Sequence, residues 1–459
     1  MNSAGAAPVR ALPARLLAYY GDDFTGSTDV MEVMAAAGLH TVLFVAPPGP
    51  ADLARFPGAL AIGVAGTARA QSPAWMDEEL PQQFERLAAL GAPIVQYKVC
   101  STFDSSPQVG SIGRALELGR RVLRPVAPVP IVVGAPRLGR YVAFANLFAS
   151  ASGGIFRIDH HPTMARHPVT PMREADLRRH LATQTAARVD SFTLPALQAP
   201  DAVTRLQLLL AQAPHAILFD TVDEATLAQV GRLLWECLPG PLFSVASSGL
   251  QYALVAHWRA AGLLAPATAP ARADVAQAVV AVSGSCSPAT AAQIDAAAAA
   301  GWDDIALDPL ALLDEARATG YAARSADPAR RALATGRSVV LHTARGPDDP
   351  RRRRVDAALA AGPNARQVTL ARLGAALGRL LDAVLDGSRV TRAVVCGGDT
   401  AGAVVEALGI RALTMRAPLA PGSPLCDAHG GAHDGMQLAL KGGQVGGPDY
   451  LLAAQRGQP

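Results

Sequence analysis

Residues 17–29 read LAYYGDDFTGSTD and form the most informative segment of the chain. A short apolar run ends at two adjacent carboxylates, Asp22 and Asp23, and a turn of Gly, Thr and Ser residues then leads into an amphipathic segment from Val30 to Ala37. This pattern predicts a strand, a loop and a helix, with both acids at the carboxyl end of the strand. Because open α/β sheets bind ligands beyond that end of their strands, the two aspartates are candidate site residues.

Two interpretations of the aspartate pair are open at this point. Neighbouring carboxylates repel each other, so a functional pair needs a metal, a sugar hydroxyl or proton transfer to hold it together. In the alternative, Asp23 or Thr25 caps the following helix and Asp22 interacts favourably with the helix dipole.

Apolar runs and helical patterns continue to alternate through the first half of the chain. The predicted strands cover residues 16–20, 41–45, 60–64, 94–98, 131–133, 215–220 and 242–246. Helical periodicity lies between them at residues 76–90 and 109–123, and Pro81 predicts that the former helix starts only there. Strands that alternate with helices indicate a mainly parallel sheet flanked by helices.

A change in composition divides the chain. Residues 261–274 read AGLLAPATAPARAD, which is rich in Ala and Pro and has little periodicity, as in an interdomain linker. A second α/β pattern follows, with predicted strands at residues 278–282, 305–307, 338–343, 393–396 and 413–415. We therefore expect an α/β protein with two domains, residues 1–262 and 275–459, each built on a mainly parallel sheet flanked by helices.

Three glycine-rich turns distinguish the second half. Residues 282–288 (VSGSCSP) and 396–402 (CGGDTAG) each follow a predicted strand and precede a helical segment, and residues 441–447 (KGGQVGG) lie near the end. Backbone N–H groups at such turns can bind phosphate, although sharp turns need glycine in any case. Three turns in one domain favour a nucleotide site. The motifs G-x-x-x-x-G-K-[ST] and G-x-G-x-x-G and the protein-kinase set are absent.

The overall composition points to a soluble cytosolic enzyme. The chain has 459 residues, a formal net charge of +3 and 50% hydrophobic residues, many of them alanine. So small a charge does not indicate a nucleic-acid or membrane-surface partner, and the basic cluster Arg351 to Arg354 opens a helical pattern as a solvated helix start does. Five scattered cysteines without a C-x-x-C pair argue against a disulfide framework and a structural zinc site. No uncharged apolar segment reaches the about 18 residues of a membrane helix.

In content and order, these motifs resemble those of the four-carbon acid sugar kinases. The DDFTG at residues 22–26 with Asp29 is similar to the family's D-D-F-T-G-x-x-D signature, and Lys98 with Asp104 and Ser105 is similar to its K-x-D-S-T element. Further similar elements are GR at 139–140, SGL at 248–250, GSCSP at 284–288, GGDTAG at 397–402, PGSP at 421–424 and LKGG at 440–443. The resemblance covers nearly the whole chain.

The resemblance implies two α/β domains with the active site in the cleft between them, the first domain holding a sugar acid and the second holding ATP with Mg²⁺. The implied activity is transfer of the γ-phosphoryl group to a hydroxyl of a four- or five-carbon sugar acid, such as a tetronate, 3-oxo-tetronate or 3-oxo-isoapionate. Asp22 or Asp23 is expected to orient the hydroxyl and accept its proton. No protein ligand is assigned to the metal.

The expected contacts divide between the two domains. Those for the substrate are Thr25, Lys98, Asp104, Ser105 and Arg140. Those for the nucleotide are Ser283, Gly284, Ser285, Ser287, Gly397, Gly398, Asp399, Thr400, Gly442 and Gly443.

One departure from the family pattern concerns the substrate's carboxylate. Members continue K-x-D-S-T with L-R-G-N, whose arginine is expected to meet an anionic substrate, whereas this chain has no arginine between Lys98 and Arg114. The candidate replacements, which would supply the cation that a carboxylate needs, are Lys98, Arg69, Arg137 and Arg140. A His-rich segment, residues 159–168, either lines the substrate pocket or is a polar loop whose histidines bind backbone groups.

Two other functions are alternatives. A metal-dependent sugar-acid isomerase or aldolase would use Asp22, Asp23, His160 and His161 as ligands, but it leaves the glycine-rich turns unexplained. A non-enzymatic sugar-acid sensor would close two α/β lobes on its ligand, but no DNA-binding motif accompanies them. The pattern is compatible with a homo-oligomer.

Overall fold

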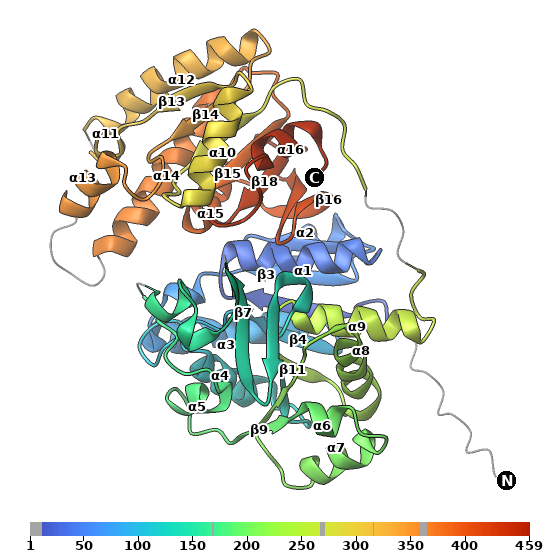
Figure 1. The fold of residues 1–459 in the computed structure, drawn as a ribbon. Coiled ribbons are helices and arrows are strands. Elements are labelled where there is room, and N and C mark those ends of the chain that lie inside the picture. Colours follow the sequence, from blue (N-terminus) through green and yellow to red (C-terminus); the bar gives the residue numbers. More distant parts are fainter. Residues whose placement is uncertain (1–11, 152, 168, 267–270, 315, 359–364) are drawn as a thin grey trace. The chain divides into compact units, whose positions relative to one another are not determined.

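The computed structural model describes residues 12–151, 153–167, 169–266, 271–314, 316–358 and 365–459. Contacts divide the chain into two compact units, which Figure 1 shows mainly in blue to yellow-green and mainly in yellow to red. Unit 1 comprises Met1–Thr41 and Pro47–Thr268, and unit 2 comprises Val42–Ala46 and Ala269–Pro459. A short segment from the first half of the sequence, Val42–Ala46, thus belongs to unit 2.

Unit 1 is built on a parallel sheet with the strand order β3-β1-β4-β11-β5-β10-β9. Its strands are β1 (Leu17–Gly21), β3 (Ala61–Ala65), β4 (Ile94–Lys98), β5 (Val129–Val132), β9 (Val189–Phe192), β10 (Ala216–Phe219) and β11 (Leu242–Ala246). All but β9 were predicted, so the expected parallel sheet is confirmed. Because neighbouring strands run parallel, the carboxyl ends of β1, β4 and β11 lie side by side.

Helices cover the sheet of unit 1 (Figure 1). They are α1 (Phe24–Ala36), α2 (Pro50–Ala54), α3 (Pro73–Ala89), α4 (Ile112–Leu123), α5 (Leu177–Ala182), α6 (Leu194–Leu197), α7 (Ala202–Leu210), α8 (Glu224–Arg232) and α9 (Gly249–Ala260). Leu80 and Phe84 of α3 and Leu116 of α4 share one buried core with Tyr97 and Val129 of the sheet. This packing holds the strand ends in a fixed register.

The prediction that Pro81 starts a helix is wrong. Helix α3 begins at Pro73 and contains Pro81 within it. Ser72 caps the helix by accepting the N–H of Trp75, and proline at the first helical position favours that start. The buried side chains Met76, Leu80, Phe84 and Leu87 continue one apolar face across Pro81, so tertiary packing outweighs the lost backbone hydrogen bond.

A small antiparallel sheet in unit 1 was not predicted. It consists of β6 (Arg140–Ala143), β7 (Asn146–Ala151) and β8 (Gly154–Arg157). The turn between β6 and β7 places Phe144 and Ala145 at φ of 50° and 65°, without the glycine that usually indicates such a turn. The carboxylate of Asp220 accepts both of their N–H groups, at 2.7 and 3.0 Å. The residue that stabilises this turn is therefore remote in sequence.

Unit 2 is built on a sheet with the order β13-β14-β12-β15-β18-β17-β16-β2. The strands are β2 (Thr41–Phe44), β12 (Val280–Ser283), β13 (Asp303–Ala306), β14 (Val339–His342), β15 (Arg392–Cys396), β16 (Ala412–Ala420), β17 (Ser423–His429) and β18 (Gln437–Lys441). The neighbouring strands β13, β14, β12, β15 and β18 pair parallel. The pairs β18–β17, β17–β16 and β16–β2 are antiparallel. The strands β17 and β18 were not predicted, and β16 is longer than predicted.

The helices of unit 2 are α10 (Pro288–Ala299), α11 (Pro309–Leu313), α12 (Ala318–Ala334), α13 (Pro350–Ala358), α14 (Ala365–Leu385), α15 (Gly398–Ala407) and α16 (Tyr450–Arg456). The basic cluster does open a helix, α13. Arg351 is nevertheless not simply solvated, because its guanidinium binds Asp349 and the carbonyl oxygens of Leu307 and His342.

Residues 261–266 and 271–274 contain no helix or strand, as expected of a linker, and the part of the expected linker at 267–270 lies outside the described residues. All five cysteines are free. In the described part of the chain, every helix is too short or too polar to cross a membrane.

Candidate active site

The two aspartates lie at the carboxyl end of β1, where one guanidinium binds both. Arg69 donates from Nε and Nη2 to the carboxylate of Asp22, at 3.1 and 2.7 Å, and from Nη2 to Asp23 Oδ1 at 2.9 Å. Asp22 is buried, and burial raises its pKa, an effect that the charge of Arg69 opposes. An arginine 47 residues away in the sequence thus balances the repulsion between the adjacent carboxylates.

Asp23 is also the N-cap of α1. Its Oδ1 accepts the N–H of Gly26 at 2.8 Å, and Thr25 Oγ1 donates to its Oδ2 at 3.0 Å. Of the two candidate caps, Asp23 is the one used. Capping still leaves the side chain of Asp23 24% exposed, compared with 4% for Asp22, so Asp23 is the more accessible carboxylate.

Lys98 ends β4 beside β1 and forms a second buried group with Asp29 and Ser248. Its Nζ lies 3.9 Å from Asp29 Oδ2, and only 2% and 12% of the two side chains are exposed. Asp29 Oδ1 and Ser248 Oγ are buried and form no hydrogen bond of good geometry with the described residues, but the Ser248 hydroxyl lies close enough to Asp29 to oppose the rise in its pKa that burial causes. Because buried polar atoms normally have partners, these oxygens mark a place for a polar ligand.

Gly26 allows the two groups to approach each other. A Cβ at this position would lie 2.2 Å from Asp23 Oδ1 and 3.0 Å from Lys98 Nζ. Asp29 and Ser248 were not among the expected contacts. Both belong to the motifs DDFTG-x-x-D and SGL, which is the signal that could have identified them.

The remaining expected substrate contacts do not all join this group. Burial would raise the pKa of Asp104, but the charge of Arg69 and a hydrogen bond from Thr102 outweigh it and lower the pKa. Asp104 therefore lies within the field of Arg69. Ser105 instead contacts His180 Nε2 at 2.9 Å and accepts a hydrogen bond from Gln184, on the side of α5.

Two other candidate cations are engaged elsewhere. Arg140 donates to the carbonyl oxygens of Leu138 and Gly139, and its Nε is buried without a partner among the described residues. Arg137 forms an exposed ion pair with Glu224. Thr25, Lys98 and Asp104 thus lie near Asp22 and Asp23. The described contacts of Ser105, Arg137 and Arg140 are with other residues, outside this group.

The His-rich segment binds its own backbone. His161 Nδ1 accepts the N–H groups of Thr163 and Met164, both at 3.2 Å, and His167 Nδ1 accepts that of Thr170 at 3.1 Å. His160 is 74% exposed. Among the residues that the structure describes, no group of three or more His, Cys, Asp and Glu side chains is arranged to hold a metal ion. The histidines thus bind backbone groups, as a polar loop predicts, while His167 also lies close enough to Asp104 to help lower its pKa, so pocket lining stays an alternative for that residue.

We expect His180 to make the protein less stable in acid. Burial lowers the pKa of His180 from 6.5 to about 4, although Asp104 and Glu174 act to raise it. Because the folded pKa lies below the unfolded one, the stabilisation is complete above about pH 6.5 and is lost as the pH falls towards 4, by roughly 3 kcal/mol. Urea unfolding of the wild type and of His180→Gln at pH 7 and pH 4.5 measures this; parallel losses in the two proteins would contradict it.

The three glycine-rich turns of unit 2 lie together. They follow β12, β15 and β18, which are neighbouring parallel strands whose carboxyl ends share one edge of the sheet. A Cβ on Gly284 would lie 2.4 Å from Thr400 Oγ1, and one on Gly443 would lie 2.8 Å from Ser285 Oγ. The turns therefore pack against each other as closely as glycine permits. The side chain of Asp399 lies outside the described residues.

The turn that follows β12, residues 282–288, is called the serine turn here, and its own hydroxyl groups organise it. Ser283 Oγ accepts the N–H of Ser285 at 3.3 Å, and Ser285 Oγ accepts that of Ser287 at 3.2 Å. Ser287 caps α10 by accepting the N–H of Thr290, and its hydroxyl donates to the carbonyl oxygen of Gly443. The N-termini of α10 and α15 thus open at the same edge, an arrangement that favours an anionic ligand.

Comparison with known protein families matches both units. Residues 17–254 match the model of a sugar-binding N-terminal domain, and residues 280–451 match that of a nucleotide-binding C-terminal domain. The chain belongs to the four-carbon acid sugar kinase family. As a member of this family it is a kinase that acts on sugar acids, so the resemblance drawn from the motifs is confirmed and the isomerase and sensor alternatives are set aside.

Curated relatives of this kinase span nearly its whole length. A 3-oxo-isoapionate kinase of Paraburkholderia graminis is 51% identical over 96% of this chain and 94% of its own. The 3-oxo-tetronate kinases of Pseudomonas fluorescens and Methylobacterium radiotolerans are 32% and 34% identical, over 96% and 94% of this chain and 97% and 96% of theirs. Among solved structures, a Salmonella typhimurium LT2 protein shares the fold, with a TM-score of 0.76 and 24% identity over 96% of this chain and 99% of that one.

A cavity of about 60 Å³ in the kinase's unit 2 adjoins the serine turn. Its lining comes from the serine turn, α11, the end of β14, α13 and α14: Gly284, Cys286, Pro309, Thr343, Ala344, Arg352, Val355, Asp356, Leu370 and Leu373. Apolar walls with a few polar groups are the usual lining of a small-molecule site, although this volume is smaller than a nucleotide base fills.

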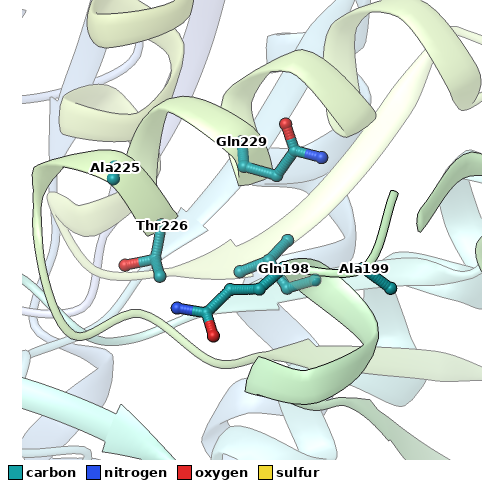
Figure 2. A pocket seen from close by; sticks show the side chains of 6 residues that line it. Gln198, Ala199, Ala225, Thr226 and Gln229 are labelled. Carbon is teal, nitrogen blue, oxygen red and sulfur yellow. The ribbon is translucent and has the colours of Figure 1, made fainter. Parts of the chain in front are cut away.

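A larger hollow, of about 310 Å³, lies beside α8 in unit 1 (Figure 2). Its lining, Leu197, Gln198, Ala199, Ala225, Thr226 and Gln229, includes none of the expected site residues.

We expect Gly443→Ala to raise the KM for ATP by about tenfold or more. The new Cβ would lie 2.8 Å from Ser285 Oγ and 3.3 Å from Ser287 Cβ, so the serine turn would have to move away from the position in which we expect it to bind phosphate. Steady-state kinetics with varied ATP measure the effect. The control is Gly320→Ala in α12, where the nearest neighbour is Arg324 Nη1 at 3.4 Å. An unchanged KM in folded Gly443→Ala would contradict the assignment of this turn.

Proposed function

We propose that this kinase transfers the γ-phosphoryl group of ATP to a hydroxyl of 3-oxo-isoapionate or a closely similar branched oxo sugar acid. The observation that carries the choice of substrate is the 51% identity to a 3-oxo-isoapionate kinase, against 27–34% to the 3-oxo-tetronate kinases. The absence of the family's L-R-G-N arginine supports the same choice, because it separates this chain from the usual pattern at the substrate site.

The carboxylate that accepts the substrate's proton is proposed to be Asp23. Its side chain is the more exposed of the pair, and its Oδ2 has Thr25 Oγ1 as a hydrogen-bond partner, which leaves room for a substrate hydroxyl. Both oxygens of Asp22 are bound by Arg69, so Asp22 holds the guanidinium in place. As the proton moves to Asp23, the hydroxyl oxygen bonds to the γ-phosphorus and the bond to the bridging oxygen breaks, releasing ADP.

Lys98, Asp29 and Ser248 are proposed to bind the rest of the sugar acid. The ammonium of Lys98 suits the substrate's carboxylate, and the buried oxygens of Asp29 and Ser248 suit its hydroxyl groups. Within this arrangement, Lys98 takes the place of the arginine that the motif lacks. Ser105, whose contacts lead to α5, and Arg140 are left out of the proposed substrate shell.

The nucleotide is proposed to bind in unit 2, with its phosphates at the serine turn and the rest of the molecule directed towards the apolar walls of the adjoining cavity. The backbone N–H groups at the start of α10 and α15 fit phosphate oxygens, and Mg²⁺ bound to the phosphates would neutralise part of their charge. Transfer requires that the substrate site of unit 1 and the phosphate site of unit 2 meet during turnover, with water excluded from the reacting groups.

An ADP-release assay with ATP and Mg²⁺ tests this proposal. We expect 3-oxo-isoapionate to give a kcat/KM at least about tenfold above that of 3-oxo-tetronate, the scale on which closely related substrates are discriminated. A preference for 3-oxo-tetronate would overturn the choice of substrate. Absence of ADP release with every four- and five-carbon sugar acid, in a protein shown to be folded, would overturn the proposed reaction.

A further inference from the structure

Lys441, the last residue of β18, is a fully buried cation to which the proposed function has given no role. It is 0% exposed, and its Nζ donates to Thr290 Oγ1 at 3.0 Å and, more weakly, to the carbonyl oxygen of Gly443 at 3.4 Å. It also lies 5.8 Å from the ring centroid of Tyr450. Among the side chains that the structure describes, no carboxylate lies within ion-pairing distance of this ammonium. Burying a cation without an anion is costly, so a site that keeps one needs a counter-charge.

The hydrogen bonds around Lys441 point in one direction. A lysine ammonium only donates, so Thr290 Oγ1 must accept from it. The hydroxyl proton of Thr290 is then directed to the carbonyl oxygen of Gly443 at 2.9 Å or to Ser285 Oγ at 3.1 Å. Ser285 Oγ also accepts the N–H of Ser287. When Thr290 donates to Ser285 Oγ, the hydroxyl proton of Ser285 is left for a ligand at the edge of the turn.

The group therefore forms a chain of hydrogen bonds from the buried charge of Lys441 to the hydroxyl of Ser285 in the serine turn. Lys441 polarises the hydroxyl of Thr290, and Thr290 in turn supports Ser285 as a donor, because linked hydrogen bonds strengthen one another. The last member of this chain lies in the same turn whose N–H groups open towards the phosphate edge. The ligand that completes it must be an anion with oxygen acceptors, and in a nucleotide site that means a phosphate group.

We propose that Lys441 is a positioning residue for the nucleotide's phosphates, acting through Thr290 and Ser285 as the buried counter-charge of the serine turn. This inference rests on the proposed function, because it assigns a further residue to the same nucleotide site. It explains why β18 ends in a lysine directly before Gly442 and Gly443. The role is electrostatic, so it concerns the charged phosphates and not the base or the ribose.

Titration calorimetry with ADP and with adenosine separates this role from a role in packing. Lys441→Met removes the charge and keeps an unbranched side chain that fits a buried site. We expect ADP affinity to fall by about 30-fold or more and adenosine affinity to stay within about twofold. Thr290→Val, which keeps the shape but breaks the chain of hydroxyls, should weaken ADP binding by about fivefold. Equal losses for ADP and adenosine, or unchanged ADP affinity in folded Lys441→Met, would overturn the inference.

Proton linkage in the wild type provides a measurement that needs no variant. Burial lowers the pKa of Lys441, an effect that Cys396 opposes, and the other titratable group facing it is Tyr450. A bound phosphate would raise the pKa again, so ADP binding should take up protons within the alkaline range below the ordinary lysine pKa of 10.5, where ADP itself is fully ionised. Calorimetry in two buffers of different ionisation enthalpy measures this uptake, and its absence would overturn the inference. A folded wild type that binds no ADP at all would instead overturn the proposed function.

Discussion

Asp23→Asn is expected to lower kcat by roughly 10²-fold or more while the protein stays folded. Asparagine caps helices about as well as aspartate, so its side-chain oxygen can still accept the N–H of Gly26. It cannot take a proton from the substrate hydroxyl. Single-turnover and steady-state kinetics, with thermal unfolding to check the fold, therefore separate the capping role of Asp23 from the proposed role in proton transfer.

Asp22→Asn provides the contrast. Asp22 is buried and binds Arg69 through both oxygens, so the change is expected to lower stability more than it lowers turnover. Asp23→Asn should therefore lose mainly turnover, and Asp22→Asn should lose mainly stability. Near-normal turnover in folded Asp23→Asn would refute the proposed assignment of the base.

Arg69→Met is expected to destabilise the protein by about 3–5 kcal/mol, because it leaves a buried carboxylate without its partner. Arg69 binds Asp22 and Asp23 directly, and its charge lowers the pKa of Asp104. Arg69→Lys should recover only part of the loss, since an ammonium cannot form the two parallel hydrogen bonds of the guanidinium with Asp22. Urea unfolding near pH 7 measures the change in the free energy of unfolding.

The matched control for this prediction is Arg137→Met. Arg137 also forms two hydrogen bonds with a carboxylate, that of Glu224, but 53% of each side chain is exposed. Exposed ion pairs contribute little, so this variant should lose no more than about 1 kcal/mol. Equal losses in Arg69→Met and Arg137→Met would contradict the central role of Arg69.

The parts of the fold that were predicted correctly depend on short-range patterns. Apolar runs at residues 16–20, 94–98 and 242–246 are strands because parallel strands buried on both faces are apolar along their length. Polar and glycine residues directly after them mark the carboxyl ends, where ligands bind. From these patterns alone, the aspartates, Lys98 and the serine turn could be identified as candidates.

The errors arose where tertiary contacts outweigh local signals. Pro81 normally breaks a helix, but the apolar face of α3 is buried on both sides of it. The turn at Phe144 and Ala145 has no glycine and is held by Asp220, 76 and 75 residues further along the chain. The pairing of β2 with β16 in unit 2 had no signal in the sequence around residue 42. A pattern read over ten or twenty residues contains no record of such partners.

The residue types and their places at strand ends follow from the order of amino acids, because a strand, a turn and a helix start are each specified within about ten residues. Which of these residues meet was settled by the order of strands in the sheets, which differs from their order in the chain. Arg69 reaches Asp22 because β1 and β3 pair, and Thr290 reaches Lys441 across 151 residues because β12, β15 and β18 lie side by side. Charge pairing and hydroxyl chains act over only a few ångströms, so they exist only once folding has brought those strand ends together.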